Sequence, residues 1–139
     1  MTHDAIPPFA SAAVAAAFQA FPDDVRDIAL ALRTLILDVA RETPEAGPLE
    51  ESLRWGQPAY LTTQTKSGST LRIGVLKSGD AAIFAHCATT IIGTYAATFP
   101  GMDQIEGNRA VAFSNLDAVV PERLRLLIRH GLTYHLPSA

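Results

Sequence analysis

The sequence predicts a single α+β domain, in which helices pack on a mostly antiparallel meander sheet. Apolar residues recur at helical spacing along residues 23–41, and the pattern turns to strand-like alternation after residue 48. The alternating segments are joined by short connections that contain Gly, which suit hairpins and not the long crossovers of parallel sheets. A chain of 139 residues is close to the commonest domain size and can bury a core without a disulfide or a metal.

Two helices are expected in the N-terminal part of the chain. Residues 1–9 should form an extended arm, because consecutive prolines cannot lie inside a helix, and the domain should span residues 10–139. Ser11 predicts the cap of a short Ala-rich helix, and Pro22 predicts the start of a longer one. The charged residues of the longer helix, Arg33 included, are interpreted as a mixed solvated face. The expected core positions of the two helices are Val14, Phe18, Ile28, Leu32, Leu35 and Val39.

Strands are predicted from alternation in the middle of the chain, and helices from capping residues on either side of the last strand. The predicted strands are residues 60–65, 70–76, 81–86 and 109–113, with residues 53–55 as an optional edge strand. Lys-Ser-Gly sequences at residues 66–68 and 77–79 predict two tight hairpins with Gly at positive φ. Thr89 or Thr90 should cap a third helix, and Pro121 should start the last one.

Composition narrows the class of function. The formal net charge of -3 argues against a nucleic-acid partner, because such proteins usually carry a basic excess. The single cysteine, Cys87, rules out an internal disulfide and fits a reducing compartment. The N-terminus lacks a basic region and no apolar run is long enough to span a bilayer, so we expect neither a signal peptide nor a membrane partner. These observations predict a full-length cytoplasmic protein.

Residues 50–60 combine the only Trp with acidic, basic, amide and phenol side chains. One interpretation is a pocket wall, in which Trp55 and Tyr60 supply flat apolar surface and Gln57 orients a ligand. The other is a structural corner, in which Trp55 fills the core and Pro58 directs the chain into the next strand. The two interpretations can coexist, and both stay open.

Arg72, His86 and Arg109 are the candidate groups for binding an anion. Together with Thr89 at the start of the third helix, they could bound a cleft for a small carboxylate or phosphate, because helix N-termini attract anions. Arg109 has a second interpretation, an internal salt bridge to the Glu50–Glu51 pair.

His86 and Cys87 are weak candidates for a metal site or for nucleophilic chemistry. Adjacent residues point to opposite faces if the strand continues through both, and a thiol nucleophile would then need His130 or His135. A lone cysteine is more often a small buried residue. The sequence holds no Cys-x-x-Cys or His-x-x-x-His spacing and no phosphate-binding loop, so no metal and no cofactor are predicted.

Five short phrases occur in order along the chain: Leu32–Leu37, Glu51–Tyr60, Arg72–Gly74, Phe84–Cys87 and Glu106–Val111. Taken together they resemble one family, the YdhG-like domains of small, largely uncharacterised bacterial proteins. The resemblance covers about residues 18–132 and implies a compact α+β fold without an established enzymatic activity. One branch of that family is described as frataxin-like iron chaperones, which makes iron binding an alternative function.

The sequence therefore predicts a small cytoplasmic binding module with a pocket for a small polar or anionic ligand or for a peptide. The expected ligand-binding residues are Trp55, Gln57, Tyr60, Arg72, His86, Thr89 and Arg109. The alternatives are a frataxin-like iron-binding chaperone, an enzyme that uses Cys87 as nucleophile, and a purely structural or interacting protein, which includes a homodimer. Catalysis is left undecided, with binding favoured over it.

Overall fold

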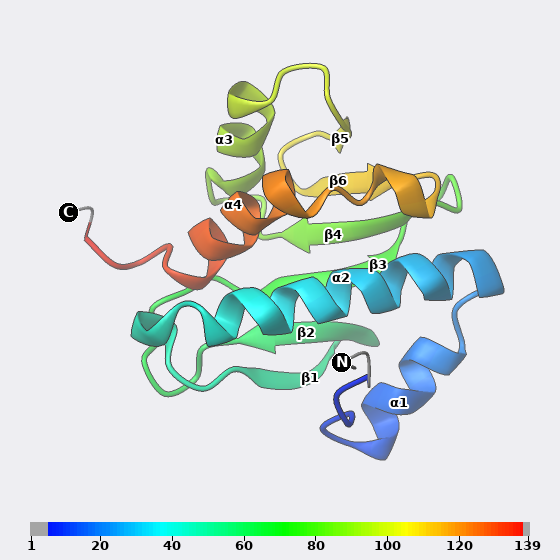
Figure 1. The fold of residues 1–139 in the computed structure, drawn as a ribbon, viewed down its shortest axis with the longest axis horizontal. Coiled ribbons are helices and arrows are strands. Elements are labelled where there is room, and N and C mark those ends of the chain that lie inside the picture. Colours follow the sequence, from blue (N-terminus) through cyan, green and yellow to red (C-terminus); the bar gives the residue numbers. More distant parts are fainter. Residues whose placement is uncertain (1–5, 138–139) are drawn as a thin grey trace.

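The computed structural model describes residues 6–137 and shows an α+β fold with a six-stranded antiparallel sheet (Figure 1). The spatial order of the strands is β1-β2-β3-β4-β6-β5, so that only the last two depart from a simple meander. The strands are β1 (Glu50–Arg54), β2 (Gln57–Leu61), β3 (Leu71–Val75), β4 (Ala81–Ala85), β5 (Gln104–Glu106) and β6 (Ala110–Phe113). The α-helices are α1 (Ala12–Gln19), α2 (Asp23–Arg41), α3 (Ile91–Thr98) and α4 (Pro121–Leu132). The fold class predicted from the sequence is confirmed.

The helices gather on one face of the sheet, where α2 and α4 lie across the strands (Figure 1). A single apolar cluster joins the inner faces of all four helices to the strand residues that point toward them, such as Tyr60, Ile73 and Val111. The expected core positions of α1 and α2 are all buried, because apolar residues at helical spacing form one continuous stripe. Within residues 6–137, no helix is long and apolar enough to cross a membrane.

The other face of the sheet is not covered by a helix in the described part of the chain. Its small apolar cluster consists of Ala82, Phe84 and Ala110 with Leu76 packed against them, all from β4, β6 and the loop after β3. Alternate residues of a strand point to opposite faces, so Arg54 and Arg72 also point to this second face. Polar side chains therefore lie over an apolar floor on the uncovered side of the sheet.

Capping and turn residues confirm several local predictions. The Ser11 hydroxyl accepts a hydrogen bond of 3.1 Å from the Val14 amide and caps α1. Pro22 directly precedes α2, and Gly79 has a φ of 94° in the hairpin between β3 and β4. Residues 1–5 of the expected arm lie outside the described residues, whereas residues 6–9 have no regular secondary structure.

The prediction of a tight hairpin at residues 66–68 is wrong. Strand β2 covers residues 57–61 instead of 60–65, and a loop of residues 62–70 connects it to β3. Gly68 does not have a positive φ; it allows a close approach, because a Cβ on it would come within 2.6 Å of the Gly131 carbonyl oxygen at the end of α4. The Lys-Ser-Gly sequence here serves loop packing against a helix and not a tight turn.

Two further boundaries differ from the prediction. The optional edge strand is a full strand, β1, and a short strand that was not predicted, β5, precedes β6. Strand β5 has only three residues and pairs with β6 at the sheet edge, which is too short a stretch to show alternation in the sequence.

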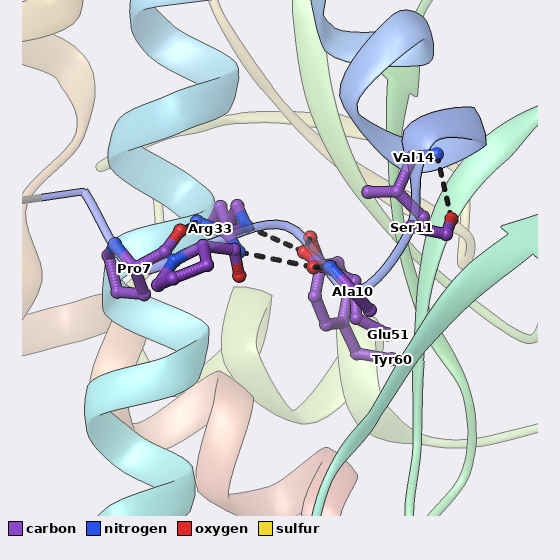
Figure 2. A network of polar contacts seen from close by, with 8 residues as sticks. Pro7, Ala10, Ser11, Val14, Arg33, Glu51 and Tyr60 are labelled. Atoms are coloured by element: carbon purple, nitrogen blue, oxygen red, sulfur yellow. Dashed lines mark hydrogen bonds and ion pairs between the residues drawn. The ribbon is translucent and has the colours of Figure 1, made fainter.

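A buried ion pair between Arg33 and Glu51 joins α2 to β1 (Figure 2). The side chains are 2% and 7% exposed, and Nε of Arg33 lies 2.6 Å from Oε2 of Glu51. The Tyr60 hydroxyl donates to the same carboxylate at 2.7 Å. The Arg33 guanidinium also donates to the carbonyl oxygens of Pro7 and Pro8, at 2.8 and 3.1 Å, and so holds the arm on the domain.

This pair corrects two predictions. Arg33 does not belong to a solvated face, because it follows Ala29 by one helical turn and lies on the same buried stripe. Glu51 pairs with Arg33 and not with Arg109, because three strands separate β1 from β6, which follows Arg109.

The network shifts the acid–base properties of its members. Burial alone would raise the pKa of Glu51, but hydrogen bonds from Arg33 and Tyr60 outweigh it and hold the pKa of this carboxyl below its ordinary value. Burial and the neighbouring carboxylate both raise the pKa of the Tyr60 hydroxyl. Glu51 is therefore a carboxylate and Tyr60 a neutral donor at neutral pH.

Replacing Arg33 tests the contribution of the pair to stability. Arg33→Met should lower the free energy of unfolding by about 3–5 kcal/mol, because it leaves the buried Glu51 carboxylate without a counter-charge. Urea unfolding at neutral pH measures this loss. The matched control is Arg41→Met in the same helix, whose exposed pair with Asp38 should contribute less than about 1 kcal/mol. Equal losses in the two variants would contradict the network.

The lowered pKa of Glu51 predicts a pH dependence of a definite sign. The unfolded chain, in which this carboxyl has an ordinary pKa of about 4.3, binds the proton more readily than the folded protein, so the Glu51 contribution is complete above that pH. It is lost as the pH falls through the lower, folded pKa. Urea unfolding from pH 7 downward should show a shallower loss of stability for Glu51→Gln than for the exposed control Glu45→Gln. Parallel curves would refute this.

Candidate functional site

The turn between β1 and β2 presents Trp55 to solvent. Arg54 pairs with Gln57, so that Trp55 and Gly56 alone form the turn, and both have positive φ, 52° and 76°. This is a type I′ hairpin, in which Asn and Gly are the favoured residues and a bulky aromatic residue is not. Trp55 is 84% exposed, so the interpretation in which it fills the core is wrong.

A concavity of about 330 Å³ lies beside this turn and extends to the loops after β4 and before β6. We call it the arginine concavity. Its lining residues are Arg54, Trp55, Thr70, Arg72, Ala85, His86, Cys87 and Arg109. The hollow thus brings together three guanidinium groups, an indole and an imidazole from four separate segments of the chain, and its size is that of a site for a small molecule.

Guanidinium groups and aromatic rings alternate along this concavity. The guanidinium carbon of Arg72 lies 5.0 Å from the ring centroid of Trp55 and 5.3 Å from that of Phe84. The guanidinium carbon of Arg109 lies 5.9 Å from the Phe84 ring. Ring faces attract the cations without neutralising them, so the N–H edges stay available to a ligand.

The arginines of the concavity differ from all other arginines of the described chain in their charge partners. In residues 6–137, none of Arg54, Arg72 and Arg109 lies within salt-bridge distance of a carboxylate. Each remaining arginine does so: Arg26, Arg33, Arg41, Arg123, Arg125 and Arg129. Although the net charge of the protein is negative, the described guanidinium groups that lack a carboxylate partner all lie at the arginine concavity.

Arg72 is the most constrained of the three. Partial burial lowers the pKa of its guanidinium, and the positive charge of Arg109 lowers it further. The only hydrogen bond of the Arg72 side chain in the described structure goes to Oε1 of Gln57, at 2.5 Å. A bound anion would relieve the repulsion between Arg72 and Arg109, because it would supply the opposite charge that both lack.

The loops opposite the turn are linked to each other by hydrogen bonds. The Asn108 side chain donates to the Cys87 carbonyl oxygen at 2.7 Å, and the Ala85 amide donates to the Arg109 carbonyl oxygen at 2.8 Å. Strand β4 ends at Ala85, so the condition for His86 and Cys87 to point to opposite faces is not met. Both line the concavity, and Cys87 is exposed instead of buried.

His86 lines the concavity, and one of its ring nitrogens is engaged by the backbone. Its Nδ1 accepts a hydrogen bond of 3.0 Å from the Ala88 amide, which places the proton of the neutral ring on Nε2. In this tautomer Nε2 can donate a hydrogen bond to an anion but cannot take a proton from the Cys87 thiol. The arrangement favours binding over nucleophilic catalysis.

The predicted site residues fall into three groups. Trp55, Arg72, His86 and Arg109 come together around the arginine concavity. Gln57 lies behind it and contacts Arg72. The other two, described next, do not line it.

Tyr60 and Thr89 were expected in the site and lie elsewhere. Tyr60 is fully buried on the helix side of the sheet, because it follows Gln57 by three strand positions, an odd number, and so points to the opposite face. The Thr89 hydroxyl donates to the His86 carbonyl oxygen at 2.7 Å and shapes the loop before α3. The cap residue of α3 is Thr90, without a side-chain capping bond.

The sequence interpretation missed Arg54, Thr70 and the floor residue Phe84. Arg54 could have been found, because strand alternation places it on the same face as its cross-strand partner Gln57. Phe84 pairs directly with Arg72 across β3 and β4, but this register is not visible in the sequence. Thr70 sits beside the end of β4 for the same reason.

A second hollow, of about 400 Å³, lies between the arm and α2 and is a weaker candidate. Its charged lining groups are already satisfied, since Arg33 pairs with Glu51 and Arg41 with Asp38. Among residues 6–137, no group of three or more His, Cys, Asp or Glu side chains is placed to hold a metal ion. Uncompensated charge distinguishes the arginine concavity from these other places.

Comparisons with protein-family models, with curated proteins and with solved structures found no match to this chain. The resemblance to YdhG-like domains stays a prediction, and function is inferred from the geometry above.

Replacing Trp55 tests whether the fold needs it. Trp55→Asn should change the free energy of unfolding by less than about 1 kcal/mol, because the gain from a favoured residue in a type I′ turn offsets the lost cation–π contact. Chemical unfolding followed by circular dichroism measures this. Gly56→Ala is the control that should destabilise, since Ala is strained at positive φ. A loss above about 2 kcal/mol for Trp55→Asn would show a structural role.

Proposed function

We propose that this protein is a binding module for a small organic anion, which it holds in the arginine concavity. The observation that carries the proposal is the gathering of three guanidinium groups without carboxylate partners in the described chain, at a protein surface of net negative charge. Guanidinium groups bind carboxylates and phosphates through paired hydrogen bonds. His86 and Thr70 add further hydrogen-bonding side chains to the same lining.

The apolar parts of the site support an organic ligand over a bare inorganic ion. The indole of Trp55 forms an exposed wall and Phe84 forms a floor beneath two guanidinium groups. A ligand with a carboxylate or phosphate group on a compact ring or short aliphatic body would use both kinds of surface. The volume of about 330 Å³ favours a small molecule over a folded partner, and a peptide would have to enter with one acidic side chain.

A second candidate function is chemistry at Cys87, and one observation favours it: the thiol is exposed in the same concavity that would gather the anion. The tautomer of His86 speaks against this imidazole as its base. We keep the cytoplasm as the expected location, because a free, exposed thiol fits a reducing compartment. Iron binding and a homodimer stay alternatives on the ground of the sequence alone.

The only Trp of the chain lies in the proposed site, so its fluorescence reports directly on ligand binding. Phenyl phosphate and benzoate should change Trp55 emission in a saturable way and bind more weakly as salt is added, because the contacts are charged. Benzyl alcohol and benzylammonium, which carry the same ring without negative charge, should have no effect. No saturable response to either anion would refute the proposal.

Arg109→Gln is the variant that connects binding to the guanidinium groups. It should weaken binding of phenyl phosphate by about tenfold or more, through the loss of one hydrogen bond between charged groups, without a decrease in the unfolding free energy, because Arg109 repels Arg72. The matched control is Arg129→Gln on α4, which removes the same charge outside the concavity. Calorimetric titration gives the affinities of all three proteins. Equal weakening in both variants would indicate a general effect of net charge and not a site.

A further inference from the structure

Gln57 occupies a position that the binding of an anion does not by itself explain. It lies half-buried at the start of β2, does not line the arginine concavity, and its Oε1 accepts a hydrogen bond of 2.5 Å from the Arg72 guanidinium. We propose that Gln57 is a positioning residue, which fixes the direction of Arg72 while leaving its positive charge available to the ligand. This inference rests on the proposed function of the concavity.

The neutral amide is the feature that matters. Elsewhere in this chain a guanidinium in a partly or fully buried place is held by a carboxylate, as Arg33 is by Glu51 at 2.6 Å and Arg123 by Asp103 at 3.0 Å. A carboxylate at position 57 would hold Arg72 equally well but would occupy its charge. An amide oxygen accepts one of the five N–H groups and leaves the rest, with the full charge, for an anion.

Gly74 makes room for this amide. It lies on β3 beside Gln57, and a Cβ added to it would come within 2.9 Å of Cδ of Gln57 and 3.2 Å of Cε1 of Phe84. Its φ is not positive, so the backbone does not require Gly here, and a strand interior disfavours Gly. The lack of a side chain at Gly74 therefore leaves space for the Gln57 side chain, which reaches Arg72.

Aromatic contacts add to the positioning. The guanidinium carbon of Arg72 lies 5.0 Å from the Trp55 ring centroid and 5.3 Å from the Phe84 ring centroid, so both rings restrict the side chain together with Gln57. Three contacts, two to ring faces and one to an amide oxygen, define the orientation without a single negative charge. Such preorganisation lowers the entropy that a ligand would otherwise lose in ordering the side chain.

Gln57→Glu separates positioning from stability. It should weaken binding of phenyl phosphate by about tenfold or more, because Arg72 then has its own carboxylate. The unfolding free energy should stay the same or rise, since the variant adds an ion pair. Weaker binding without a loss of stability indicates positioning, because a purely structural role would lower the affinity and the unfolding free energy together. Gln64→Glu, on an exposed loop, controls for the added negative charge.

Gly74→Ala provides an independent variant that changes no charge. The new methyl should displace the Gln57 amide, which is the far end of a flexible side chain, and weaken binding of phenyl phosphate severalfold while the fold is retained. Calorimetric titration with phenyl phosphate and urea unfolding are measured for wild type and the three variants. Binding by Gln57→Glu as tight as by Gln64→Glu would overturn the positioning role and leave the anion site standing. Absence of binding by the wild type would overturn both.

Discussion

The buried ion pair of Arg33 and Glu51 determines which face of β1 and β2 meets the helices. Because strand side chains alternate, holding Glu51 on the helix side sends Arg54 to the opposite side, and the antiparallel register sends Gln57 there with it. Tyr60, which donates to the same carboxylate, fixes β2 in the corresponding way. The polar network on one side of the sheet thus sets the position of the turn that carries Trp55 on the other.

The arginines on the two faces of the sheet differ in whether a carboxylate neutralises them. On the covered face, Arg33 is neutralised by the Glu51 carboxylate and also donates to two carbonyl oxygens, as a charge in a low-dielectric interior requires. On the uncovered face, Arg72 and Arg109 lie over aromatic rings and repel each other. For the fold alone, a carboxylate in reach would offset the repulsion between these two arginines, which the aromatic rings do not. The cost in stability is explained if an external anion completes the site.

The sequence predicts the helices well because their signals are local. Ser11, Pro22 and Pro121 mark helix starts, and the spacing of apolar residues marks the buried faces. It predicts the candidate site only in part, because three of its features depend on register. The turn at Trp55 and Gly56 makes residues 57–61 a strand, in which Tyr60 and Gln57 point to opposite faces. Strand β4 ends at Ala85, so that His86 and Cys87 can line the same hollow. Phe84 meets Arg72 only through the pairing of β3 with β4. The prediction of a solvated face is wrong for Arg33, because this charged residue lies on the buried stripe of α2.

The Arg33 network also bears on the order in which the chain assembles. Arg33 donates to the arm and to β1, and Tyr60 of β2 donates to the same Glu51 carboxylate, so that no two consecutive segments can complete the network. A guanidinium that loses its water before all of these groups have arrived would be unstable, and we therefore expect this contact to form late in folding. Contacts that form after the transition state slow unfolding and leave the folding rate almost unchanged. We therefore expect the contact between the arm and Arg33 to affect the unfolding rate more than the folding rate.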